Sequence, residues 1–163
     1  MNILISLNFS EENEWHKDLY LNIPTIDVEE ILDTYYFLID KSFMPNLENK
    51  QKVILSLTDN FKYWILRTEA LNKGETVAFP IDLSDEYIGF LLINALDENV
   101  LSVRYGSTQE ITGWQINAHN PEQFDLKYLN DTDISDSELI ITKEDFINDI
   151  KRNINNLHAA QSL

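Results

Sequence analysis

The 163-residue chain carries 28 Asp and Glu residues against 12 Lys and Arg residues, which gives a formal net charge of −16. Apolar residues make up 44% of the chain and aromatic residues 11%, a content typical of a folded domain and not of an acidic disordered tail. A strongly negative folded surface repels nucleic acid and anionic membranes and attracts basic protein surfaces. The composition therefore disfavours direct nucleic-acid binding and favours a protein partner.

Length and cysteine content set further bounds. A chain of this length fits one domain, so we expect a single globular domain over residues 1–163 with its last few residues frayed. The absence of cysteine excludes disulfides and thiolate metal sites. The first nine residues lack the basic region and cleavage site of a signal peptide, and no apolar run reaches the roughly 20 residues that span a bilayer. We expect a cytoplasmic protein that does not bind membranes.

Two strands are expected at the N-terminus. Apolar residues alternate over 3–9, which predicts a half-buried strand, and residues 19–23 have the composition of a second strand. The polar, acidic stretch 10–18 lies between them. The two strands form either a hairpin or a pair joined by a long loop.

Two helices are expected next. Asp27 and Glu30 have the spacing of a capping box, and the apolar stripe that follows predicts a helix from residue 27 to residue 45. A second apolar stripe predicts a helix over 49–72, closed by Lys73–Gly74.

From residue 75 onward the apolar period changes to that of short strands. Asp97-Glu98-Asn99 predicts a hairpin turn, and Thr142 with Asp145 predicts the start of a final helix that ends near residue 157. The complete pattern predicts an α+β fold, in which an antiparallel sheet of about five to six strands packs against two longer helices, with a C-terminal helix. The strands expected in this half are 76–79, 87–94, 100–105, 113–117 and 137–141.

The acidic residues around position 133 resemble the start of a calcium loop. Asp131 and Asp133 alternate as its early ligands would, but the sixth position is Asp136 in place of Gly and the twelfth is Thr142 in place of Glu. A solvated turn explains this stretch better. The three histidines make no metal-binding pair, and the chain has no nucleophile elbow, phosphate-binding glycine loop or dinucleotide fingerprint. We therefore expect no metal, no cofactor and no catalytic residues.

A first candidate binding site lies beside Pro80. Asp82, Asp85 and Glu86 form a tight acidic group there. One interpretation is an Asx-type turn between two strands. The other is a polar surface loop that engages a ligand or partner.

A second candidate binding site lies near the N-terminus. Glu11 and Glu12 precede Trp15, and an exposed tryptophan among carboxylates is typical of an interface anchor. The alternative is that this aromatic ring folds back onto the core.

Part of the chain resembles a known family. Residues 79–87, a hairpin that ends at 103–106, and Gly113-Trp114 resemble small bacterial immunity proteins of polymorphic toxin systems, and the ending 141–150 is similar to their terminal strand and helix. The resemblance covers about residues 75–157 and consists of turns and aromatic residues. It implies a non-catalytic protein that neutralises a cognate toxin by stoichiometric binding.

Charge agrees with that hypothesis. A nuclease toxin that binds phosphate is basic, and an acidic inhibitor is steered toward it. The hypothesis is an acidic immunity protein whose candidate contacts are Asp82, Asp85 and Glu86, with Glu11, Glu12 and Trp15 second. Two alternatives stay open: a small-molecule-binding or enzymatic α+β domain with an acidic cleft, and a nucleic-acid mimic that inhibits a nuclease. The sequence leaves the oligomeric state open.

Overall fold

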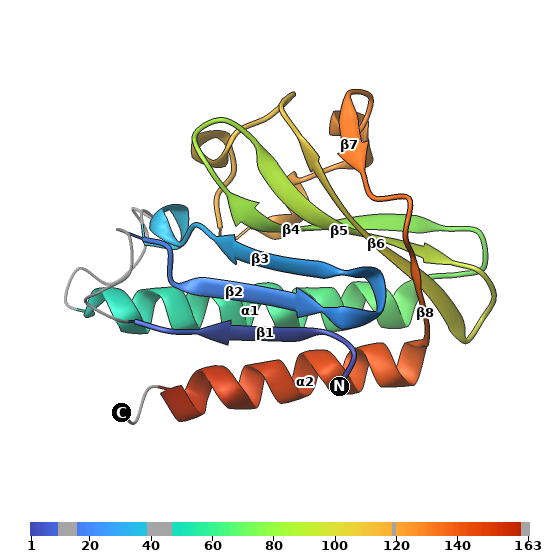
Figure 1. The fold of residues 1–163 in the computed structure, drawn as a ribbon, viewed down its shortest axis with the longest axis horizontal. Helices are drawn as coiled ribbons and strands as arrows, with labels where there is room; N and C mark the ends of the chain where they lie inside the picture. Colours follow the sequence, from blue (N-terminus) through green and yellow to red (C-terminus); the bar gives the residue numbers. More distant parts are fainter. Residues whose placement is uncertain (10–15, 39–46, 119, 161–163) are drawn as a thin grey trace.

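The computed structural model describes residues 1–9, 16–38, 47–118 and 120–160. These residues form an α+β fold with two α-helices, a three-stranded antiparallel sheet and a five-stranded antiparallel sheet (Figure 1). The predicted fold class is therefore confirmed. The strands divide into two sheets where the sequence pattern predicted one.

The three-stranded sheet comes from the first 32 residues. Strand β1 (Leu4–Leu7) pairs antiparallel with β2 (Leu19–Ile23), and β2 pairs with β3 (Val28–Leu32). The first two strands are thus antiparallel neighbours, as in the hairpin alternative. Alternate side chains of β2 are buried, because one face of this sheet packs on the core.

The prediction of a helix over residues 27–45 is wrong for the part of this segment that the structure describes. Asp27 ends the 3-10 turn Pro24–Ile26 in a left-handed conformation, with a φ of 55°, and so reverses the chain instead of capping a helix. The next five residues form β3, which gains a backbone ladder to β2. A second 3-10 turn, Tyr35–Phe37, follows. Residues 39–45 lie outside the described part of the chain.

The five-stranded sheet contains the longer strands. The central antiparallel meander is β4 (Thr76–Leu83), β5 (Ile88–Ala95) and β6 (Val100–Thr108). Two short strands, β7 (Thr132–Ile134) and β8 (Leu139–Thr142), pair with opposite ends of β6. Four of these strands were predicted, although with shorter or shifted bounds, and β7 was not.

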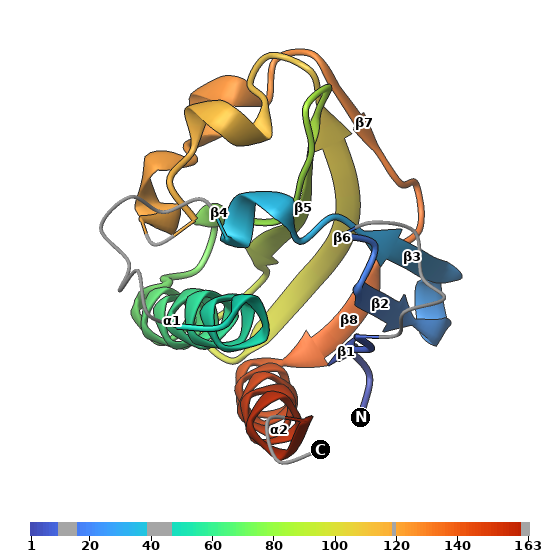
Figure 2. The ribbon, with the colours of Figure 1, turned by 90° about the vertical axis from the view of Figure 1, so that its left-hand side faces the viewer.

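The two helices cover the core. Helix α1 (Asn49–Ala70) confirms the prediction for 49–72, and α2 (Lys143–Ala160) confirms the C-terminal helix. The Thr142 hydroxyl accepts the Asp145 N–H at 3.0 Å, so the predicted cap is present. The two helices pack against each other, and α2 also contacts β1 and β8 (Figure 2). Neither they nor any other helix of the described residues is long and apolar enough to cross a membrane.

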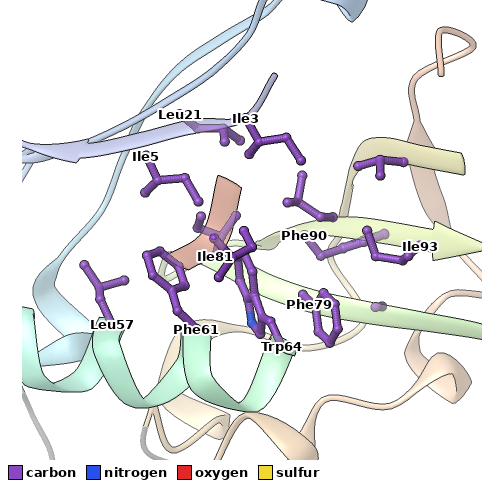
Figure 3. Close-up of a cluster of buried hydrophobic side chains, with 14 of the residues drawn as sticks. Ile3, Ile5, Leu21, Leu57, Phe61, Trp64, Phe79, Ile81, Phe90 and Ile93 are labelled. Carbon is purple, nitrogen blue, oxygen red and sulfur yellow. The ribbon is translucent and has the colours of Figure 1, made fainter. Parts of the chain in front are cut away.

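The core forms where α1 meets both sheets. The ring of Trp64 stacks on that of Phe79, with centroids 5.1 Å apart and planes 11° apart. Ile5 and Leu21 of the three-stranded sheet, and Ile3 just before it, point toward this pair (Figure 3). The two sheets and α1 therefore share one hydrophobic core.

Polar side chains of α2 cover the free edge of β1. The Asp149 carboxylate accepts the N–H of Asn2 at 2.6 Å and of Ile3 at 3.1 Å. The Asn153 amide donates to the Ile3 carbonyl at 3.0 Å and accepts the Ile5 N–H at 3.2 Å. These bonds replace the strand partner that an edge strand lacks.

Candidate functional site

A tight turn, Ser84–Tyr87, joins β4 to β5 at the first candidate site. The Ser84 hydroxyl accepts the N–H of Glu86 at 3.2 Å and of Tyr87 at 3.1 Å. The Ser84 N–H also donates to the Tyr87 carbonyl at 3.1 Å. The expected turn is present, but a serine closes it where an Asx-type turn was predicted.

The three acids predicted to form one group occupy three different environments. Asp82 lies within β4 and is only 1% exposed, so in this conformation its carboxylate does not reach a partner. Asp85 is exposed and accepts a hydrogen bond from the Tyr36 hydroxyl, which is the main reason that the pKa of Tyr36 is raised to about 12. Glu86 is exposed, and its carboxylate makes no ion pair or hydrogen bond within the described residues. Glu86 is therefore the freest of the three carboxylates.

Asp82 instead links the two sheets. Its carboxylate accepts the backbone N–H of Asp33 at 3.0 Å, just beyond β3, and the Tyr87 hydroxyl at 2.7 Å. Burial raises the pKa of Asp82, and these two hydrogen bonds oppose that rise in part. The residue is thus a buried structural acid next to the acidic turn.

An exposed tryptophan stands beside the same turn. Residues 113–117 were predicted to form a strand, but the structure has a 3-10 turn at Gly113–Gln115 instead. Trp114 in this turn is 70% exposed, the most of any large hydrophobic side chain among the described residues. Sequence reasoning noticed Gly113-Trp114 only as part of a resemblance and did not predict a contact role for Trp114.

The turn that carries Trp114 is held rigidly against the acidic turn. The Gly113 N–H donates to the Ser84 carbonyl at 2.6 Å. A Cβ on Gly113 would lie 2.5 Å from Tyr36 Cδ2 and 2.9 Å from the Leu83 carbonyl carbon, so only glycine fits. The Gln115 side chain accepts the Thr112 N–H at 2.9 Å and closes the turn from the other side.

These features define one surface, which we call the Trp114 face: Trp114 with the exposed acids Asp85 and Glu86. An exposed indole next to exposed carboxylates has the composition of a protein-binding surface, since tryptophan supplies contact area and the acids select a basic partner. The second predicted group, Glu11, Glu12 and Trp15, lies outside the described residues.

The stretch compared with a calcium loop is partly a strand. Asp133 lies in β7 and pairs with Ser107 of β6. Within the described ranges, no group of three or more His, Asp or Glu side chains is placed to hold a metal ion.

No protein-family model matches the chain, and the comparisons with curated proteins and with solved structures give no match either. The resemblance to immunity proteins therefore stays a prediction from the sequence.

Proposed function

We propose that this protein is an immunity-type inhibitor that neutralises a basic toxin by stoichiometric binding through the Trp114 face. The observation that carries the proposal is Trp114 itself, 70% exposed in a turn whose Gly113 N–H bonds the Ser84 carbonyl of the turn that carries Asp85 and Glu86. Asp82, buried behind this surface, is excluded from the proposed contacts.

An ordered backbone makes the turn of Trp114 suitable to carry an anchor residue. Association costs free energy for every side chain and loop that must be ordered in the complex. The turn around Trp114 is already held by the Gly113–Ser84 hydrogen bond and by the side chain of Gln115. The ordering cost of this backbone is therefore met before a partner binds.

The net negative charge of the protein favours fast association with a basic partner. A net charge of −16 raises the association rate with a basic partner by roughly 10- to 1,000-fold at low salt. Lifetime then depends on a few buried anchors, which in this surface means the indole. We expect the complex to form fast at low salt and more slowly at high salt.

The test is capture of the partner by the full-length protein from an extract of its own source, with four variants. Trp114→Ala and Glu86→Lys change the proposed face. Leu96→Ala and Glu98→Lys are matched controls, because both residues are exposed and follow the other end of β5, about 25 Å away at the usual strand rise.

The expected partner is a single basic protein, bound one to one by the wild type and by both controls. Trp114→Ala weakens its binding by about 30-fold or more, the loss typical of an interface anchor. Glu86→Lys mainly slows association, and more than Glu98→Lys does. Equal capture by all four variants would remove the Trp114 face from the proposal.

A further inference from the structure

A polar cavity of about 370 Å³ lies between β3 and the five-stranded sheet. This volume falls in the range of small-ligand pockets, roughly 300–1,000 Å³. The side chains around it come from β3, β5–β6 and the β7 region: Glu30, Tyr87, Tyr105, Ser107, Asp133 and Ser135. None of its lining residues is cationic, and two are carboxylates.

Glu30 occupies a strand position that normally points into the core. It pairs with Leu21, which is buried, and Val28 and Leu32 on the same side of β3 are buried too. Glu30 is nevertheless exposed, because the cavity opens at this point of the sheet. Glu30 therefore lies on the side of β3 that faces the core. It is not one of the acids on the solvent-facing side of the strand.

Two tyrosines, Tyr87 and Tyr105, line the same cavity as Glu30. Burial is the main cause that raises the pKa of Tyr87 and of Tyr105; Asp82 is the next cause for both, and the charge of Glu30 adds a smaller contribution. Only glycine at position 89 leaves room for Tyr105, since a Cβ on Gly89 would lie 2.6 Å from the Tyr105 hydroxyl. Tyr105 is half-buried, and it lines the cavity.

The lining therefore selects a particular chemistry. Carboxylates only accept hydrogen bonds, and the serine and tyrosine hydroxyls also accept them. Aromatic faces attract cations. A guanidinium or a primary ammonium group carries several N–H donors and a positive charge, and so satisfies both features. A quaternary ammonium group carries the charge but no donors.

We propose that this cavity binds an organic cation with several N–H donors, held by Glu30 and Asp133 against the Tyr105 ring. The cation is either a free small molecule, such as a polyamine, or a basic side chain of a protein partner. This proposal is independent of the Trp114 face, because binding to the cavity is measured on the purified protein without a protein partner.

The experiment is an NMR titration of the tyrosine ring resonances of the purified full-length protein. The probes are spermidine, N-acetyl-arginine methylamide and choline. Glu30→Gln is compared with Glu29→Gln, which makes the same charge change one residue away on the opposite face of β3. Both residues are exposed, so neither change disturbs the core.

We expect saturable shifts of the Tyr105 resonances with spermidine or with the arginine probe. Binding becomes weaker by about tenfold or more in Glu30→Gln, because a charged hydrogen bond is lost, and changes little in Glu29→Gln. Choline binds more weakly than the better N–H donor probe. Tighter binding of spermidine assigns the site to a free polycation, whereas tighter binding of the arginine probe assigns it to a side chain. Absence of saturable shifts with both N–H probes, or equal losses in the two variants, overturns the proposal.

Discussion

The contact between α2 and β1 gives a sharp prediction for stability. Asn153 is fully buried, and its amide bonds the carbonyl of Ile3 and the N–H of Ile5. Asn153→Leu removes both bonds and leaves the two backbone groups buried, since Ile3 and Ile5 are themselves fully buried. The side chains have similar volumes, so the change creates no large cavity.

The expected cost follows from these two orphaned groups. Each buried backbone group without a partner costs about 1–3 kcal/mol, so Asn153→Leu lowers the free energy of unfolding by about 2–6 kcal/mol. That loss is a large fraction of the roughly 5–15 kcal/mol that stabilises a typical domain. The variant therefore retains the fold only marginally.

Equilibrium urea unfolding followed by circular dichroism measures the loss. Asn155→Leu is the matched control, because it makes the same substitution on the exposed side of α2 and changes stability by no more than about 0.5 kcal/mol. If the two variants unfold at the same urea concentration, the side chains of α2 do not satisfy the edge of β1 and the reasoning is refuted.

Three further changes test the region around the acidic turn. Gly113→Ala forces a Cβ against backbone atoms of the neighbouring turn and lowers the free energy of unfolding by about 1–3 kcal/mol in urea titration; an unchanged midpoint would contradict the close approach. Burial raises the pKa of Asp82 above its unfolded value of 3.8, so its contribution to stability is complete below that value and is lost as pH rises through the folded pKa. Asp82→Asn should therefore gain stability relative to wild type as urea titrations move from pH 3 toward neutral pH, and a constant difference would show that the carboxyl group is not perturbed. Tyr36→Phe removes one phenol that ionises near pH 12, which alkaline absorbance titration detects as a loss at that pH with no loss near pH 10.

Patterns within short stretches of sequence predicted those helices and strands that depend mainly on their own residues. The long apolar stripe of α1, the Thr142 cap of α2 and the successive strands β4 to β6 all appear in the structure. The segment after Asp27 was predicted wrongly, because its spacing fits a helix, whereas the left-handed conformation of Asp27 turns the chain back to pair with β2. β7 was missed for another reason, since three mostly polar residues become a strand only against β6, which is distant in the sequence.

The candidate site was predicted only in outline. The sequence located the turn that carries Asp85 and Glu86, but it did not distinguish them from Asp82, because burial depends on how β3 packs near β4. The exposure of Trp114 was equally hidden. It results from the contact of Gly113 with Ser84, 29 positions earlier in the chain. No local pattern contains such a contact.

The measurement that tests the central claim most directly is protection of cells against the captured basic partner. The partner is expressed together with wild type, Trp114→Ala or Leu96→Ala, and growth is compared at equal levels of folded inhibitor. The account predicts that wild type and Leu96→Ala protect and that Trp114→Ala does not, because its binding is weaker by about 30-fold or more. Full protection by Trp114→Ala would contradict it.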